Sequence, residues 1–430
     1  MPEPTEVDQD SVVRARNTLL ASGRRTPREE VDAYRVLARV SPAAYLPPLA
    51  RALLRQLSHD RVYADRPLDR LALRQEAVAA ARAVDPADAK YADVLYEALD
   101  SCQWALYDIG RRAEGLAVRA EMLAVGRAGA EASGSGTVRG LSVWATGLLE
   151  EGRCAEAADV LAESVAQARP HGPASGAFAW SLLEWIAALD AAGRSDEALT
   201  AMAELVGMEA TEAANDRGPQ ACHLYVLIRY AQMLDAALRH GEAAAARQEA
   251  LALLGELAAH GERKSWSGYQ TTFWSVLFSM SAAESERPVP GRPRPPVGTA
   301  PQHWSPDVRE RYFDSRETLR ADVDRLALRA ADDPDHLAEL VRLQRVLTVR
   351  SAVHWELRTH LFAERVRGLF DEGVALARRL RRADPAAGSG ALAVALTDRA
   401  CFRTAGKEFD AALDDFRQVP ELLGPCTEPV

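Results

Sequence analysis

Apolar residues recur along this chain every three to four positions, the period that places them on one face of an α-helix. Over the first quarter of the chain this pattern predicts helices at 11–22, 28–39, 43–58 and 68–84. The last of these ends by Asp85-Pro86, because the residue that precedes a proline avoids the helical region. The same period continues through most of the remaining sequence. We therefore expect an all-α protein.

A longer period divides the helical pattern into repeats. Five segments begin with a glycine, continue with mostly polar residues and carry a small residue five places on. The first three glycines lie 42 and 41 residues apart, and the fourth follows after 48. The five segments are Gly110–Gly115, Gly152–Ala157, Gly193–Ala198, Gly241–Ala246 and Gly406–Ala411.

Each glycine is expected to end one helix, since a left-handed residue is needed there and glycine adopts it without steric penalty. The small residue is expected where the following helix crosses the first one closely. Apolar residues stand four places before each glycine, and in the first four segments also eight places before it, which puts both on one helix face. These residues are Leu106, Leu148, Leu189, Ala237 and Phe402, with Cys102, Trp144, Trp185 and Met233. The fifth segment has Asp398 at the second position.

The glycine turn, the upstream apolar pair and stretches such as Leu148–Asp159 resemble tetratricopeptide (TPR) repeats. The resemblance extends over about 95–260, continues through 336–418 and is inferred for 11–90. The spacings exceed the ~34 residues of the standard repeat, so helices or loops are longer here. The resemblance implies a right-handed α-solenoid of TPR-like antiparallel helical hairpins.

In TPR-like hairpins the first helix of each repeat lines a concave groove that binds extended or helical peptides. Carrying the groove positions over from the glycines gives a partner-binding set, for which core or ordinary surface is the alternative at every position. The set is Asp100, Trp104, Tyr107, Asp108, Arg139, Ser142, Thr146, Trp180, Leu183, Asp190, Ile228, Asp235 and Arg239. Trp, Tyr and Arg are the residue types that dominate interface energetics.

Breaks in the pattern predict the domain organisation. Residues 1–10 are expected to be a disordered tail, followed by a helical repeat array over 11–283. Residues 284–306 hold so many prolines that an extended linker or loop is expected, either as a plain connector or as a ligand for a peptide-binding module. A second helical repeat block is expected over 307–430, with loops at Pro385–Gly390 and from Gly424.

Composition narrows the class of partner. The net charge is -10, and Lys and Arg form no basic stripe, so direct nucleic-acid binding is not expected. Lysine occurs only at Lys90, Lys264 and Lys407, an Arg-rich bias typical of GC-rich bacterial genomes. The five cysteines stand singly, which favours a reducing cytoplasm. Neither a signal peptide nor an apolar run of membrane-helix length is found, so no membrane association is expected.

The motifs of catalysis and cofactor binding are not found. His354 and His360 are six residues apart, a separation that points their side chains to different helix faces, and His223 follows Cys222 directly. There is no phosphate-binding G-x-x-x-x-G-K-[ST] loop and no G-x-S-x-G nucleophile turn. We therefore expect no catalytic residues, no metal site and no cofactor.

The segment Lys264–Trp274 is unusually aromatic for a chain with 6% aromatic residues. It is expected to begin the last helix before the proline-rich segment. Its rings can pack against the preceding repeat, or they can form an exposed cluster that marks a partner site.

Three functions are compatible with these features. The first is a non-catalytic scaffold that binds a partner protein or peptide in the groove. The second is a ligand- or peptide-responsive regulator in a bacterial signalling or transcription-control system, although no helix-turn-helix is evident. The third, an enzyme with a helical catalytic domain in 303–430, has the least support because no nucleophile and base are paired in the sequence. Self-association of the solenoid stays open.

Overall fold

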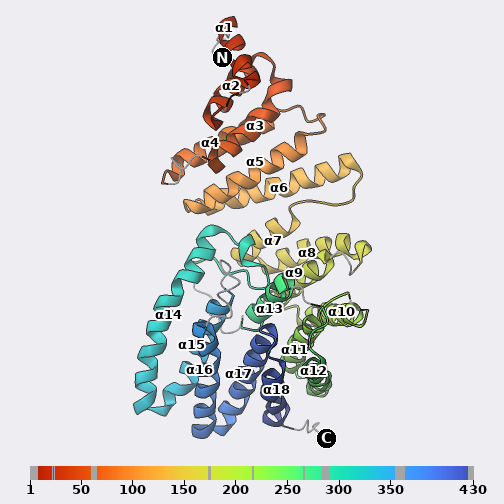
Figure 1. Cartoon of the computed structure of the whole chain (residues 1–430), viewed down its shortest axis with the longest axis vertical. Helices are drawn as coiled ribbons and strands as arrows, with labels where there is room; N and C mark the ends of the chain where they lie inside the picture. The colour runs from red at the N-terminus through yellow and green to blue at the C-terminus, as the bar shows by residue number, and fades with distance from the viewer. Residues whose placement is uncertain are drawn as a thin grey trace. The chain divides into compact units, whose positions relative to one another are not determined.

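The computed structural model of the chain describes residues 8–21, 23, 25–59, 65–172, 176–215, 217–264, 267–282, 291–353 and 364–424. Within these residues there are 18 α-helices and no β-strand. Within each of the two units described below, most helices that follow one another in the sequence pack as antiparallel hairpins, and hairpins pack against one another (Figure 1). The fold is therefore an all-α solenoid of helical hairpins, which confirms the predicted fold class.

Contacts between residues divide the chain into two compact units. Unit 1 comprises Met1–Gly147 together with Ser305–Asp307, and unit 2 comprises Leu148–Trp304 together with Val308–Val430. This division differs from the one that the sequence predicted at 284–306. Helices from both sides of the proline-rich segment contact one another, so they belong to the same unit.

Unit 1 is built from the first hairpins of the chain. Its helices are α1 (Gln9–Leu20), α2 (Pro27–Val40), α3 (Pro42–His59), α4 (Pro67–Arg82), α5 (Tyr91–Asp108), α6 (Arg112–Ser133) and the first part of α7 (Leu141–Glu150). The four helices predicted before residue 85 are confirmed to within two residues at each end. Of the predicted tail, Gln9 and Asp10 already belong to α1, and residues 1–7 lie outside the described part.

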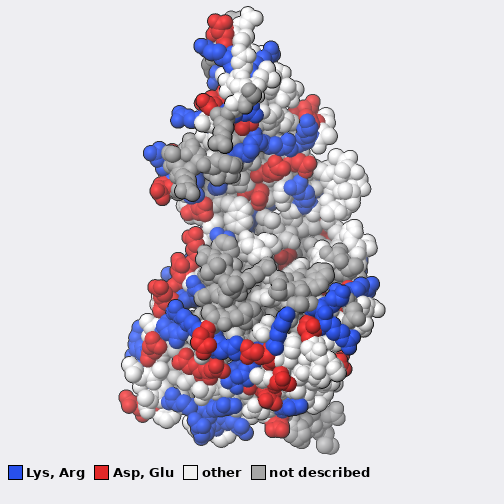
Figure 2. All heavy atoms as spheres, in the orientation of Figure 1, with Lys and Arg blue, Asp and Glu red and all other residues white. Residues whose placement is uncertain are grey.

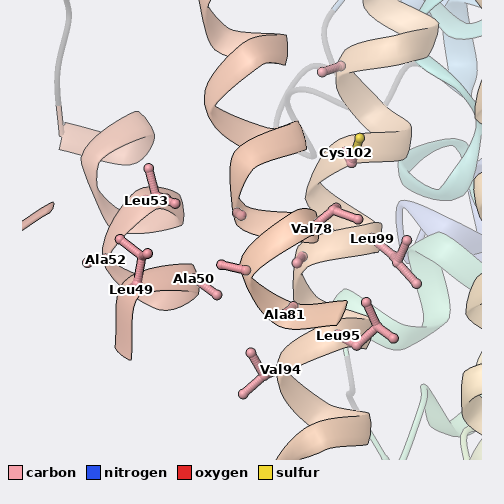
Figure 3. Close-up of a cluster of buried hydrophobic side chains, with 14 of the residues drawn as sticks. Leu49, Ala50, Ala52, Leu53, Val78, Ala81, Val94, Leu95, Leu99 and Cys102 are labelled. Atoms are coloured by element: carbon pink, nitrogen blue, oxygen red, sulfur yellow. The ribbon is translucent and has the colours of Figure 1, made fainter. Parts of the chain in front are cut away.

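The core of unit 1 lies between α3, α4 and α5 (Figure 3). Leu53 of α3, Ala81 of α4 and Leu99 of α5 are completely buried, and Cys102 of α5 belongs to the same cluster. Burying each leucine side chain contributes roughly 1.5–3 kcal/mol to folding. Because α4 offers mainly alanines to this layer, the neighbouring helices can approach closely.

Unit 2 contains the remaining hairpins. Its helices are α8 (Cys154–Ala168), α9 (Ala177–Ala191), α10 (Ser195–Ala214), α11 (Gln220–Ala236), α12 (His240–His260), α13 (Ser267–Ser281), α14 (Pro306–Asp332), α15 (Leu337–Ala352), α16 (Glu364–Ala383), α17 (Pro385–Ala405) and α18 (Phe409–Leu423), with the end of α7 and without the first residues of α14. Residues Pro385–Gly390, predicted as a loop, begin α17 instead. Asp384 caps that helix by accepting hydrogen bonds from the backbone N–H groups of Ala386 and Ala387.

The hairpins of unit 2 do not stack in chain order. The α17/α18 hairpin lies directly against α11/α12, because α12 contacts α18 and α11 contacts α17. The intervening helix α13 contacts α11, α15 and α17 (Figure 1). Residues 291–304 also pack onto the unit, and the Trp304 side chain is only 1% exposed. The described part of the proline-rich segment is therefore built into the solenoid.

Five turns between helices share one hydrogen-bond pattern. A residue with positive φ follows each first helix: Gly110, Gly152, Gly193, Leu238 and Lys407, with φ between 60° and 77°. The next N–H donates to the carbonyl five residues earlier, as from Arg111 to Leu106 at 2.8 Å. This is the Schellman arrangement, which satisfies carbonyls left free at a helix end.

The register of the last two repeats differs from the sequence prediction. The left-handed residues are Leu238 and Lys407, whereas Gly241 lies inside α12 and Gly406 has φ of −79°. Counting from Leu238 makes Ala243 the small residue at the helix crossing, and it is fully buried like Ala157 and Ala198. The predicted glycine is not the left-handed residue in these two repeats, because leucine and lysine occupy that position.

Candidate partner-binding face

The groove positions can be compared between repeats once the turn residue is used as the origin. We call the positions ten and six residues before the left-handed residue the groove face. In unit 1 the groove face of α5 is Asp100 and Trp104, and both are half-buried. In unit 2 it is Leu183 and Ala187 in α9, Ile228 and Gln232 in α11, and Thr397 and Cys401 in α17, of which all but Gln232 are buried.

In α5, Tyr96, Asp100 and Trp104 follow one another at intervals of four, so they form a stripe along one side of the helix. We call these three residues the α5 stripe. All three side chains are half-buried, so each keeps part of its surface free within unit 1. A carboxylate between two aromatic rings offers both contact area and a negative charge.

Two arginines flank the α5 stripe. The Arg139 guanidinium lies 4.0 Å from the centre of the Tyr96 ring, and its Nη1 donates to Asp93 Oδ1 at 2.7 Å. Arg119 from α6 is fully buried and lies 6.0 Å from the Trp104 ring. Its Nε donates to Gln103 Oε1 at 3.0 Å, which ties α6 to α5 below the stripe.

Burial raises the pKa of Asp100, whereas hydrogen bonds from Gln103 and Trp104 and the charges of Arg119 and Arg139 lower it by less. The Gln103 amide donates to Asp100 Oδ1 at 3.4 Å. The ionised carboxylate is therefore short of solvation in the isolated unit. A cation placed beside Asp100 would supply the missing stabilisation.

The other two predicted positions of α5 behave differently. Tyr107 is 0% exposed, and the guanidinium groups of Arg119 and Arg112 lie 4.5 and 5.0 Å from its ring centre. Its ring also explains Gly115, because a Cβ there would lie 2.9 Å from the ring edge. Tyr107 is thus a core residue. Asp108 is partly exposed, and its carboxylate lies 3.8 Å from Arg70 Nη2.

The predicted positions at the start of α7 add little open surface. Arg139 is exposed and belongs to the edge of the α5 stripe. Ser142 is half-buried, and its carbonyl accepts a hydrogen bond from the Thr146 hydroxyl at 2.8 Å. Thr146 is buried.

In α9, the chain itself covers the predicted groove. The ring of Trp180 lies 5.8 Å from that of Phe273 in α13 in an edge-on arrangement, and Leu183 is completely buried. Gly298 lies against Ala187 so closely that a Cβ on the glycine would be 2.1 Å from the alanine methyl group. Asp190 stays exposed, with Arg229 Nη2 at 3.4 Å.

In α11, the corrected register assigns two of the predicted groove residues to other structural roles. Arg239 follows the left-handed residue, as Arg111, Arg153 and Arg194 do, and like them it pairs with the glutamate three residues on, here Glu242 at 2.6 Å. It is therefore a turn residue rather than a groove residue. Asp235 pairs with Arg247 and lies 3.3 Å from His240 Nδ1, while Ile228 is buried.

Helix α13 covers the groove faces of α11 and α17. Its residues Trp274 and Phe278 lie opposite Ile228 and Cys401, and the gap left between the three helices measures only about 30 Å³. Trp274 is 1% exposed and packs 6.2 Å from Phe402 of α17. In unit 2 the face that would accept a partner is thus filled by α13 and residues 291–304.

The rings at the end of the aromatic segment, the only ones of this segment that are described, pack into the core, which agrees with the first of its two interpretations. Phe273 and Trp274 are both buried, and α13 begins at Ser267. Trp266 lies outside the described residues, as do His354 and His360. His223 is buried, which lowers its pKa, and its Nε2 lies 3.7 Å from Glu249.

Three residues of the unit 1 face were missed by sequence reasoning. Tyr96 lies one turn before the positions carried over from the family, and Arg119 and Gln103 were not among the predicted positions. The four-residue spacing of Tyr96, Asp100 and Trp104 was a signal that could have found the first of them. The buried Arg119 becomes visible only when α6 is packed against α5.

Comparisons with known proteins do not assign this chain to a family. No protein-family model matches the chain, and no curated protein matches its sequence. Among solved structures, a circular tandem repeat protein with novel repeat topology and enhanced subunit contact surfaces is 14% identical, covering 96% of this chain and 88% of that one with a TM-score of 0.19. A likeness of that extent says nothing about the function of this chain.

The face of the molecule seen in Figure 2 shows no dominant charge. Acidic and basic side chains are interspersed over the face seen in Figure 2. Among the described residues, no helix combines the length and the apolar character that crossing a membrane requires. The α5 stripe is distinguished by its half-buried rings and carboxylate.

Proposed function

We propose that this chain is a non-catalytic, TPR-like scaffold of a bacterial cytoplasm that binds a segment of a partner protein on the α5 stripe. One observation carries the proposal: the groove face is half-open in α5 of unit 1, whereas the chain covers the same positions of α9 and α17 itself. The TPR-like turns and the Arg-rich composition support the family and the bacterial source.

The chemistry of the stripe indicates the kind of partner segment. Tyr96 and Trp104 offer ring faces to an apolar side chain, and Asp100 between them lacks part of its solvation. A helical or extended peptide with a Lys or Arg beside an apolar residue matches both features. The charged group would stabilise the Asp100 carboxylate, and the apolar group would bury the rings.

The experiment is a quantitative affinity capture of the tagged full chain from its own cells, followed by mass spectrometry. The variants are Asp100→Lys and Trp104→Ala, and the control is Asp414→Lys, an exposed acid of α18. A true partner is lost with both stripe variants and retained with the control, while the melting temperature of all variants stays close to wild type.

The captured partner then allows a direct titration with the purified chain. Because Trp and charged anchors at interface centres contribute about 2 kcal/mol or more, each stripe variant should weaken binding by roughly 30-fold. A partner that binds the Asp100→Lys and Trp104→Ala variants as tightly as wild type would refute the proposed site.

A ligand- or peptide-responsive regulator is the second candidate, and the covering of unit 2 favours it. Helix α13 lies across the groove faces of α11 and α17, and its last residue Ser281 is held by Arg345 of α15 through bonds of 3.0 and 3.1 Å. Helix α13 is held over these faces by its buried rings and tied to α15 at its last residue, so a ligand that bound α15 or the rings would bias its position.

A further inference from the structure

A cavity of about 280 Å³ lies within unit 2 between α15, α16 and α17 and is partly open to solvent, since Ala338 and Ala387 in its lining are exposed. Its walls are mainly apolar and come from all three helices, with Val341, Phe370 and Val394 as examples. Room for the cavity arises because several lining residues are small, among them Gly373 and Ala391. A Cβ built on Gly373 meets no atom within 4 Å, so the space beside this glycine is open.

The polar groups at the cavity are already paired. Arg345 Nε donates to Asp398 Oδ2 at 2.8 Å, and both side chains are largely buried. Arg342 is paired with Glu339 at 2.7 Å. The hydroxyl of Thr348 donates to the Gln344 carbonyl at 2.8 Å. The two arginines are thus neutralised by two carboxylates, and a ligand would bring no benefit by carrying a charge of its own.

Size and polarity together define the ligand. An apolar cavity of roughly 150 Å³ can hold one benzene molecule. A cavity of 280 Å³ has room for a bicyclic aromatic or a medium-length aliphatic molecule. We propose that this cavity is a binding site for a small, uncharged, mainly apolar molecule. Its affinity would come from the apolar surface removed from water.

The site connects to the helix that covers the groove faces. Phe370 in its wall stacks on Phe402 at 4.4 Å between ring centres and lies 6.4 Å from Trp274 of α13. Arg345, at the polar end, also holds Ser281 at the end of α13. A ligand that moves Phe370 or Arg345 therefore acts on α13. This inference deepens the regulatory candidate and is independent of the α5 stripe.

The first test uses N-phenyl-1-naphthylamine, an uncharged probe that fluoresces in apolar surroundings, with the full-length chain. Gly373→Leu fills the cavity, and Gly368→Leu is the matched control, because it adds the same side chain to an exposed position of α16 with no atom within 4 Å. We expect one probe per chain, a higher melting temperature with probe present, and at least a tenfold loss of affinity in Gly373→Leu only. Equal binding by wild type and Gly373→Leu, or no binding by wild type, would overturn the site.

A second cavity-filling variant tests whether Gly373→Leu loses the probe by filling the cavity or by disturbing the fold. Ala391→Phe fills the cavity from α17, and circular dichroism establishes that each variant is folded. Both filling variants should lose the probe while they keep the wild-type helical signal. If Ala391→Phe is folded and binds the probe normally, the probe lies elsewhere and the inference fails.

The charge assignment has its own test. 2-Naphthol and 2-naphthoate share one ring system and differ in charge at neutral pH. We expect 2-naphthol to displace the probe at least tenfold more effectively. Equal or better displacement by 2-naphthoate would contradict an uncharged ligand. Asp100→Lys should bind the probe like wild type, so that failure of the partner-binding proposal and failure of this one are distinguished.

Discussion

Helix α5 in unit 1 and helix α9 in unit 2 occupy the same place in their repeats but present different groove faces. In α5 the two positions are Asp100 and Trp104, both half-buried. In α9 they are Leu183 and Ala187, which are 0% and 7% exposed because α13 and residues 291–304 lie over that face of the unit. In these two helices, the polarity of the groove-face residues therefore corresponds to whether other parts of the chain cover that face.

The difference has a physical origin. A face that the chain covers permanently must be apolar, since an unpaired carboxylate buried there would cost several kcal/mol. A face that binds a partner reversibly must be stable both with and without it, so it combines rings with a group that water can still reach. The covered faces of unit 2 follow the first rule, and the α5 stripe has the composition that the proposed partner binding requires.

The largest effect expected from this comparison is on stability. Trp274→Ala should lower the free energy of unfolding of unit 2 by about 3–5 kcal/mol, because the ring is 1% exposed and packs against α16 and α17. Trp104→Ala should cost less, about 1–2 kcal/mol, since part of the Trp104 side chain stays exposed. Guanidinium denaturation followed by circular dichroism measures both. Similar losses would mean that the two faces are equally part of the core.

The second prediction concerns pH. Burial, together with the charge of Glu212, raises the pKa of Glu209 in unit 2 from 4.5 to about 7. The folded state therefore holds this proton more tightly than the unfolded chain does. The contribution to stability is fully present below about pH 4.5 and is lost as the pH rises through 7, at most about 3 kcal/mol.

The variant Glu209→Gln should remove this pH dependence, and Glu256→Gln, at an exposed position of α12, should not. The measurement is the urea midpoint at a series of pH values between 4.5 and 8. The difference between wild type and Glu209→Gln should grow with pH. A constant difference would show that Glu209 does not titrate in this range.

The third prediction concerns larger side chains at the positions where the two helices of a hairpin cross. Ala198→Leu and Ala243→Leu in unit 2 should each lower stability by about 1–3 kcal/mol, because both alanines are fully buried at the crossing. In unit 1 the same position is Gly115, and Gly115→Ala should already be destabilising, since the Tyr107 ring occupies the space of a Cβ. Thermal melting compares them with Ala245→Leu, an exposed position expected to change stability by less than about 0.5 kcal/mol. A tolerated Ala243→Leu would refute the corrected register.

The smallest effect concerns the turns. Leu238 has φ of 60° and is 79% exposed, so it gains little from packing to offset its left-handed backbone. Leu238→Gly should stabilise unit 2 by about 0.5–1 kcal/mol, and Gly110→Ala should destabilise unit 1 by about 1 kcal/mol. Calorimetric melting of both variants tests the sign. A destabilised Leu238→Gly would mean that the leucine makes contacts that outweigh its strain.

Sequence reasoning recovered most of the local structure and half of the candidate face. The helices before residue 85 and the turns at Gly110, Gly152 and Gly193 were predicted, because each depends on residues within one helical turn. Asp100 and Trp104 were named as groove residues from the family resemblance, and the structure leaves both half-open. Tyr107 and Arg239 have other roles, since one faces α6 and the other is a turn residue.

The sequence by itself determined the helical class, the hairpin repeats and the caps, because these follow from side-chain period and from hydrogen bonds between near neighbours. Only the tertiary structure decided that α17/α18 stacks on α11/α12, that α13 covers the groove faces between them, and that the α5 stripe stays half-open. Such contacts join residues more than a hundred positions apart, as between Trp274 and Phe402. They depend on the fit of whole helix faces, which no local pattern encodes.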